Sequence, residues 1–243
     1  MKSKKNELPY LHFSTHRSGS VPIGILLEHY MENAAGIHGL GDVFEMRPAF
    51  QLPRDRRLKE WSRGASVASI QKRWKWLQAQ DQDFFFTVYP VIPTEVMQSL
   101  LKNYQFVFSE RRNLVAQVLS FLIVENEHRF YRKGGLRLRK ESVVADYSLF
   151  RKIEGQLFQY FRIKAELKPK KVLTYEDFLK KTPAKFLKAA GFSQEIDWSG
   201  VELTDMQNPK DKLVLFKNPD DIESWYRESY LEKLCPWKKG LKD

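Results

Sequence analysis

Apolar residues recur along the chain at two spacings, and these spacings predict which segments are strands and which are helices. Residues 10–14 alternate and are rich in aromatic side chains, which is typical of a β-strand. Ser20 is a predicted N-cap, and the apolar residues after it lie three or four positions apart until Gly36, so this segment is predicted to be a helix. Residues 83–92, DFFFTVYPVI, form the strongest predicted strand.

The remaining elements follow from the same periodicity and from turn residues. Residues 105–108, QFVF, form a short apolar segment, and 168–171, KPKK, is predicted to be a linker. Residues 212–217 resemble a strand, and Pro219 opens a last amphipathic helix. Further helices are predicted over 54–63, 66–80, 95–104, 111–124 and 144–163.

The order of the elements predicts an α+β protein. Up to residue 110 the order is βαβ, a helical insert, and βαβ, which is the order of a ferredoxin-like domain with an insertion after its second strand. We therefore predict a ferredoxin-like domain over 1–110 with a helical insert at 53–80. A mainly helical domain over 111–243 is predicted to carry a basic β-hairpin at 128–141.

The predicted hairpin contains RFYRKGGLRLRK, which has six basic residues and no acidic one around the two-residue turn Gly134-Gly135. Because side chains alternate across a strand, basic and aromatic groups share one face, whereas Tyr131, Leu136 and Leu138 share the other. The first face suits a sugar-phosphate backbone. Its members are Phe130, Arg132, Arg137 and Arg139.

The helix predicted over 66–80 offers a second basic surface. Its apolar face consists of Ile70, Trp74 and Leu77, so its cations and second tryptophan are predicted to point elsewhere. These two surfaces and three arginines of the helix predicted over 54–63 supply the predicted nucleic-acid contacts. These are Arg129, Phe130, Arg132, Lys133, Arg137, Arg139, Lys140, Lys72, Arg73, Trp76, Arg54, Arg56 and Arg57.

Composition and charge agree with an anionic partner. The chain has 243 residues, 41 Lys and Arg against 30 Asp and Glu, and a formal net charge of +11. Such a balance favours nucleic acid, with RNA preferred over DNA. The single cysteine, Cys235, excludes an intramolecular disulfide and a cysteine-rich zinc site. Without a secretory signal or an apolar span of membrane length, we expect a cytoplasmic protein that has no membrane partner.

Histidines are the candidate catalytic residues. His29 lies late in the first predicted helix, and His38 lies in the loop GIHGLG. Imidazole can take a proton from a ribose 2′-hydroxyl near neutral pH, although His29 could equally pack on the sheet and His38 decorate a loop. His12 and His16 share a face, but two imidazoles do not define a metal site. No metal and no cofactor are therefore predicted.

Three segments carry a family resemblance, namely YLHFST, PIGILLEHYMENAAG and DFFFTVYPVIPTEVMQSLLKNYQFVFS. They resemble the N-terminal ferredoxin-like half of CRISPR RNA-processing endoribonucleases of the RAMP superfamily, over less than half of the chain. The resemblance implies guide-RNA binding or metal-independent cleavage within an antiviral defence complex, with His29, or failing that His38, as the catalytic histidine. The family's C-terminal glycine-rich loop has no match after Gly135, so a non-cleaving subunit fits equally.

Two other functions stay open. The segment 56–80 can be read as a helix-turn-helix, which would make the chain a DNA-binding protein of replication, transposition or transcription. Alternatively, the chain is a scaffold subunit that binds an acidic protein through aromatic residues of its C-terminal part. Those residues are Trp225, Tyr226, Tyr230 and Trp237.

Overall fold

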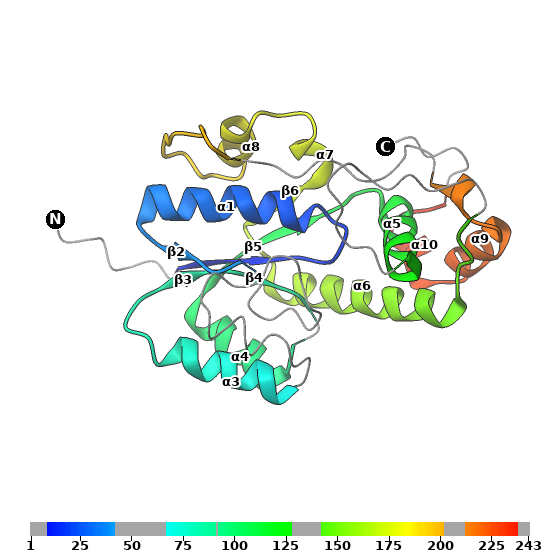
Figure 1. Cartoon of the computed structure of the whole chain (residues 1–243), viewed down its shortest axis with the longest axis horizontal. Helices are drawn as coiled ribbons and strands as arrows, with labels where there is room; N and C mark the ends of the chain where they lie inside the picture. Colours follow the sequence, from blue (N-terminus) through cyan, green and yellow to red (C-terminus); the bar gives the residue numbers. More distant parts are fainter. Residues whose placement is uncertain (1–8, 42–66, 91, 128–141, 202–211, 238–243) are drawn as a thin grey trace.

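The structure is a computed structural model that describes residues 9–41, 67–90, 92–127, 142–201 and 212–237. Within these residues, helices and strands alternate around a parallel sheet (Figure 1). The protein is thus a mixed α/β protein. No helix in the described part of the chain combines the length and the apolar character that a membrane span requires.

Four strands form the main sheet, in the order β4-β1-β5-β6, and all of their pairings are parallel. In the register, Phe13 lies opposite Val88 on one side and Phe108 on the other. The short strands β2 and β3 also pair in parallel. The strands are β1 (Tyr10–Phe13), β2 (His38–Gly39), β3 (Phe84–Phe85), β4 (Thr87–Val88), β5 (Gln105–Glu110) and β6 (Lys171–Thr174).

Residues 84–88 join the two strand groups. The amide of Leu40 donates to the carbonyl of Phe85, while the amide of His12 donates to the carbonyl of Phe86. One segment therefore bonds to β2 on one side and to β1 on the other. Strands β2, β3 and β4 therefore lie on one side of β1, and β5 and β6 lie on its other side.

Helices cover both faces of the sheet (Figure 1). Helices α1 and α8 pack on one face, α3, α4 and α6 pack on the other, and α5, α9 and α10 lie beyond the carboxyl ends of the strands. The helices are α1 (Ser20–Ala35), α3 (Val67–Gln78), α4 (Thr94–Asn103), α5 (Leu114–Glu127), α6 (Tyr147–Leu167), α7 (Tyr175–Phe178), α8 (Pro183–Ala189), α9 (Pro219–Arg227) and α10 (Tyr230–Leu234).

Side-chain alternation along β1 explains how these layers form. Leu11 and Phe13 are buried against α3, α4 and α6, and Phe13 stacks on Tyr160 of α6 with ring centroids 5.7 Å apart. His12 points to the opposite face, because a Cβ added to Gly24 of α1 would lie 3.3 Å from its Nδ1. The apolar side chains thus face one helical layer, and a polar side chain lies beneath α1.

Most of the predicted elements that fall on described residues are confirmed. The first strand is β1, and the helix that follows it runs from Ser20 to Ala35, with Gly36 as a left-handed C-cap. Residues 83–92 contain two short strands, β3 and β4, and the helices predicted after them are α4, α5 and α6. Residues 42–66 and the hairpin at 128–141 lie outside the described residues.

The predicted arrangement of the strands is corrected. A ferredoxin-like sheet contains antiparallel neighbours, whereas every described strand pair is parallel. The physical reason is the long connection between β2 and β3, which includes α3. A crossover of a dozen residues or more lets two strands run in the same direction, and a hairpin does not.

Two smaller predictions are also corrected. Strand β6, which lies after residue 110, pairs with β5. Its first residue, Lys171, belongs to the predicted linker, which was therefore too long. Residues 213–215 form a 3₁₀-helix instead of a strand.

Candidate anion-binding site

Two polar segments meet where the chain leaves the neighbouring strands β1 and β5. After β1 the chain enters α1 on one face of the sheet, and after β5 it passes through α5 to α6 on the opposite face. In open parallel sheets, ligands bind at the carboxyl ends of strands where two connections diverge in this way. The β1–α1 loop (residues 14–19) and the residues after β5 occupy that position.

The backbone of the β1–α1 loop has two left-handed residues, Arg17 with φ 62° and Gly19 with φ 80°. Such conformations alternate in loops whose N–H groups turn toward one side and bind anions. At Gly19 no other residue fits, because a Cβ there would lie 2.4 Å from Cδ2 of Tyr175. At Arg17 the conformation is costly, so the surrounding structure holds it in place.

The first turn of α1 contributes backbone donors. Its N-cap, Gly19, has no side chain that could accept a hydrogen bond from the amides of this turn. These N–H groups have no acceptor within a helix, and the helix dipole gives this end a partial positive charge. The loop and the first turn of α1 therefore combine the two features that bind phosphate or sulfate at a helix N-terminus.

Side chains from α5 hold the loop. Arg17 Nε donates to Ser120 Oγ over 2.9 Å, which orients a planar guanidinium, a group whose geometry suits a tetrahedral anion. Gln117 Nε2 donates to Thr15 Oγ1 over 2.7 Å and to the carbonyl of His16 over 2.8 Å. Because both contacts join segments about a hundred residues apart, α5 fixes the loop's conformation.

A second arginine lies beside the loop. Arg111 follows β5, is 6% exposed, and places its guanidinium carbon 4.9 Å from the centroid of the Tyr175 ring. Since Tyr175 also contacts Gly19, the two cations Arg17 and Arg111 flank the same segment. The nearby carboxylate of Glu176 accepts hydrogen bonds from the backbone amides of Arg112 and Asn113, just before α5.

A chain of buried polar side chains lies beneath the loop. His12 Nδ1 is 3.0 Å from Thr87 Oγ1, and His12 Nε2 is 2.7 Å from Ser109 Oγ. Ser109 Oγ lies 2.7 Å from Ser14 Oγ, which lies 2.8 Å from Ser18 Oγ. Complete burial lowers the pKa of His12 to about 3, so the imidazole is neutral at physiological pH.

The predicted catalytic histidines lie away from this site. His29 is nine residues after Ser20, which is about 14 Å along the helix axis. Its Nε2 donates to the carbonyl of Asp197 over 2.6 Å, and its ring tilts against Trp198 at 5.5 Å. His38 Nδ1 lies 3.6 Å from Glu32 Oε1. The structure therefore gives each histidine a different partner and does not bring them to the loop.

The predicted basic surface of α3 is correct only in part. Ile70, Trp74 and Leu77 are buried as expected, and Lys72 is exposed. The prediction is wrong for Arg73, which is fully buried and donates to the carbonyl and the hydroxyl of Ser69.

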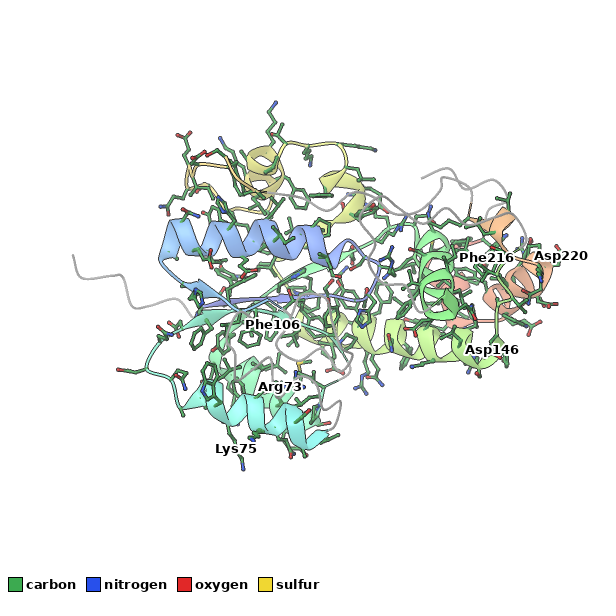
Figure 2. All side chains as sticks on the ribbon, viewed as in Figure 1. Arg73, Lys75, Phe106, Asp146, Phe216 and Asp220 are labelled. Atoms are coloured by element: carbon green, nitrogen blue, oxygen red, sulfur yellow. The ribbon has the colours of Figure 1, made fainter. Side chains whose placement is uncertain are left out.

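Helix geometry explains this burial. A residue three positions after Ile70 lies on the same face of the helix, so Arg73 follows the apolar side chains inward. In Figure 2, Lys75 points away from the protein and Arg73 points toward the sheet. Trp76 is half-buried and stacks on Phe84 with centroids 6.0 Å apart, so most of its ring packs against the protein.

The other predicted contacts fall on residues whose structure is not described. They are Arg54, Arg56, Arg57, Arg129, Phe130, Arg132, Lys133, Arg137, Arg139 and Lys140. These predictions stay predictions.

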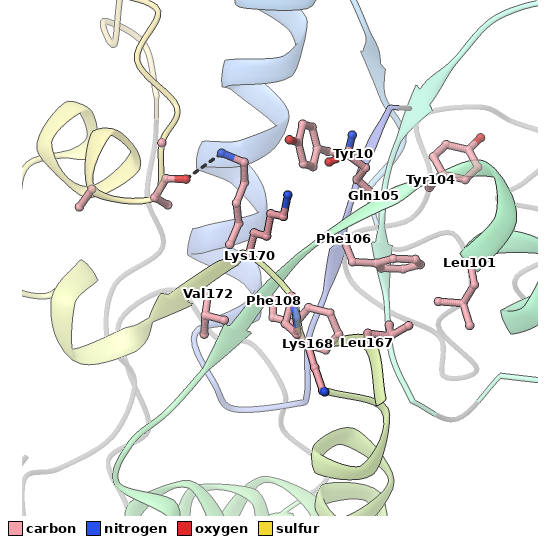
Figure 3. A pocket seen from close by; sticks show the side chains of 15 residues that line it. Tyr10, Leu101, Tyr104, Gln105, Phe106, Phe108, Leu167, Lys168, Lys170 and Val172 are labelled. Carbon is pink, nitrogen blue, oxygen red and sulfur yellow. Dashed lines mark hydrogen bonds between the residues drawn. The ribbon is translucent and has the colours of Figure 1, made fainter. Parts of the chain in front are cut away.

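A groove of about 850 Å³ lies at the opposite, amino edge of the sheet. Figure 3 shows Lys168 and Lys170 near Phe106 and Phe108 in its lining. Lys171 is already engaged there, because its Nζ donates to the carbonyl of Ala190 and lies 4.3 Å from the Phe192 ring centroid. The groove is therefore basic and aromatic, and the length of the strands separates it from the β1–α1 loop.

The sequence contained a signal for the anion site that periodicity does not detect. The heptapeptide STHRSGS, residues 14–20, joins a predicted strand to a predicted helix and combines hydroxyls, an arginine and a glycine. That composition between a strand and a helix is typical of phosphate-binding loops. The contribution of Arg111 could not be inferred, because it depends on the pairing of β5 with β1.

No protein-family model, curated protein or solved structure matches the chain.

Proposed function

We propose that the protein binds a nucleotide through its phosphate groups at the β1–α1 loop and transfers a group from that nucleotide to an acceptor. The observation that supports it best is the convergence of Arg17, Ser120 and the first turn of α1 at the ligand-binding edge of the sheet. The guanidinium of Arg17, the hydroxyl of Ser120 and the amides of Ser20 and Val21 are hydrogen-bond donors, whereas Pro22 in the same turn has no N–H. Such a set of donors is complementary to a phosphate or sulfate group.

Two cations on different elements favour a nucleotide with two separated anionic groups. Arg17 belongs to the β1–α1 loop, and Arg111 follows β5 and lies over the ring of Tyr175. One phosphate at the loop and a second near Arg111 would use both guanidinium groups. This arrangement fits a nucleoside bisphosphate better than a chain of phosphates that extends in one direction.

The transferable group that fits best is sulfuryl. In a P-loop, a lysine and then a serine or threonine follow the last glycine and serve the γ-phosphate and its magnesium ion. Here Ser20 and Val21 follow Gly19. A sulfuryl group carries one negative charge, and arginine and backbone donors can balance it. In the transfer, the oxygen of an acceptor hydroxyl attacks sulfur and releases its proton to water, the bond from sulfur to the phosphate oxygen breaks, and the nucleotide leaves with that oxygen as part of its phosphate.

Calorimetric titration with adenosine 3′,5′-bisphosphate tests the proposal. The wild-type protein should bind this nucleotide more tightly than ATP with magnesium. Arg17→Ala should weaken binding by about tenfold or more, because a hydrogen-bonded charge is lost. Arg227→Ala is the matched control, since Arg227 lies on α9 and pairs with Glu223 over 2.8 Å. Equal affinity of wild-type protein and Arg17→Ala, or no binding at all, would overturn the proposal.

Nucleic-acid binding is a second, separate proposal, and the net charge of +11 favours it. In this proposal the basic hairpin contacts RNA, in a guide-RNA or defence complex as the family resemblance implies. The cleavage by His29 that the resemblance implies is tested by His29→Ala, which should bind a stem-loop RNA and fail to cut it. A duplex-DNA competitor distinguishes the helix-turn-helix alternative, and a protein that stays free of nucleic acid at low salt supports the scaffold alternative.

A further inference from the structure

The buried chain beneath the β1–α1 loop has only one consistent direction of hydrogen-bond donation. Ser18 Oγ lies 2.6 Å from the carbonyl oxygen of Thr15, and a carbonyl can only accept, so Ser18 donates there. Its single proton is then used, and Ser18 accepts from Ser14. By the same reasoning Ser14 accepts from Ser109. The direction is thus set at the end of the chain that lies in the loop.

The direction determines the tautomer of His12. Since Ser109 donates to Ser14, it accepts from His12, and Nε2 must carry the imidazole proton. Nδ1 is then an acceptor, which the hydroxyl of Thr87 satisfies. A protonated imidazole would have two donors and would break this order, but complete burial keeps the ring neutral by lowering its pKa.

We propose that His12 is a positioning residue of the anion site, and that its Nε2–H completes the single order of donation that runs through Ser109, Ser14 and Ser18 to the loop's own carbonyl. This inference rests on the proposed function. Ser14 and Ser18 donate their hydroxyl protons inside the protein, so neither hydroxyl donates to the ligand. His12 does not touch the ligand and acts through the shape of the loop.

Burial explains why one imidazole can hold a loop. His12, Ser14, Ser18 and Ser109 are each 0% exposed, so water does not compete for their hydrogen bonds. A buried polar group that loses its partner costs considerably more than the bond gains in water. When the donation from His12 is removed, the buried Ser109 Oγ loses its donor, and a shift of the serines and of the loop above them lowers that cost.

Nitrogen-15 NMR of the imidazole tests the direction in the protein without ligand. We expect the His12 signals of a neutral ring protonated at Nε2, unchanged between pH 5 and 8. A ring protonated at Nδ1 would make Nε2 an acceptor, which is incompatible with the order of donation fixed by the Thr15 carbonyl, and would overturn the proposal. This measurement does not depend on nucleotide binding, so a protein that binds no nucleotide would overturn the proposed function and leave the tautomer result standing.

Two substitutions of His12 distinguish its role as a hydrogen-bond donor from its role in filling space. The amide nitrogen of His12→Gln can reach the position of Nε2 and donate to Ser109, whereas His12→Leu fills similar space without a donor. We expect His12→Gln to bind adenosine 3′,5′-bisphosphate within about threefold of wild type, and His12→Leu to bind about tenfold more weakly. Equal affinities of the two variants, with the loop amides equally protected from hydrogen exchange, would overturn the positioning role.

A double-mutant cycle with Ser109→Ala tests whether the effect travels along the chain. Both substitutions interrupt the same series of hydrogen bonds, so the second should cause no further loss of affinity. The double variant His12→Leu with Ser109→Ala should therefore bind as weakly as either single variant. Additive losses would contradict the proposal. Tyr226→Phe is the matched control, because it removes the hydrogen bond from a buried residue to the carbonyl of Cys235 outside this network, and it should change affinity less than about threefold.

Discussion

At the scale of single residues, Arg17 combines a strained backbone with a contact to the proposed ligand. Its φ of 62° lies in the left-handed region, which costs a residue with a Cβ about 1 kcal/mol more than it costs glycine. Arg17→Gly and Arg17→Ala both remove the guanidinium, so we expect both to lose nucleotide affinity. Chemical denaturation should nevertheless show the glycine variant to be more stable than the alanine variant by about 1 kcal/mol. Equal stabilities would mean that the loop relaxes out of the left-handed conformation.

His12 should make the stability of the protein depend on pH. Burial lowers its pKa in the folded state to about 3 from an unfolded value of 6.5, so between these values only the unfolded chain binds the proton. The free energy of unfolding contributed by His12 is complete above pH 6.5 and is lost as the pH falls toward 3, by about 1.4 kcal/mol per pH unit. The free energy of unfolding of wild type and of His12→Gln is measured by denaturation across this range. The difference between the two proteins isolates the contribution of His12, because the carboxylates contribute equally to both proteins. Parallel curves would show that His12 titrates in the folded protein.

At the scale of elements, two glycines in the middle of helices predict opposite responses to one substitution. Gly24 of α1 faces the buried chain, where an added Cβ would lie 3.2 Å from Thr87 Oγ1 and 3.3 Å from His12 Nδ1. Both neighbours are held by hydrogen bonds, so we expect Gly24→Ala to lower the free energy of unfolding. Gly155 of α6 has no atom within 4 Å of an added Cβ, and Gly155→Ala should raise it by about 0.5 to 1 kcal/mol through helix propensity. Thermal unfolding of the two variants checks whether their stabilities change in opposite directions. Higher stability of both variants would show that α1 can move away from the sheet.

Which elements form could be predicted from the sequence, because apolar spacing and cap residues are local. The end of α1 at Gly36 is an example, and its start was predicted to within one residue, since the N-cap is Gly19 instead of Ser20. How the strands pair could not be predicted, because a ferredoxin-like domain and a parallel sheet have the same order of elements. Strand β6 has only four residues and begins inside KPKK, so no periodicity marks it. The candidate site depends on this pairing, since Ser14 and Ser109 meet only when β1 and β5 lie in register.

At the scale of the whole molecule, two proposals assign anion binding to different parts of the chain, and one crossed experiment separates them. Arg132, Arg137 and Arg139, replaced together by alanine, should weaken the binding of a stem-loop RNA and flatten its dependence on salt, because fewer counterions are released. The same triple variant should bind adenosine 3′,5′-bisphosphate as wild type does. Arg17→Ala should show the reverse pattern, with nucleotide affinity lost and RNA affinity kept.

Titrations of both ligands at several salt concentrations supply the readout for this comparison. The formal charge of +11 attracts any polyanion, so a loss of RNA affinity counts only when its salt dependence also changes. If Arg17→Ala weakens both ligands equally, the β1–α1 loop binds the phosphates of RNA and the two proposals describe one site. If the triple variant leaves RNA binding and its salt dependence unchanged, the predicted hairpin does not bind RNA. Nucleotide binding at the β1–α1 loop does not depend on that result.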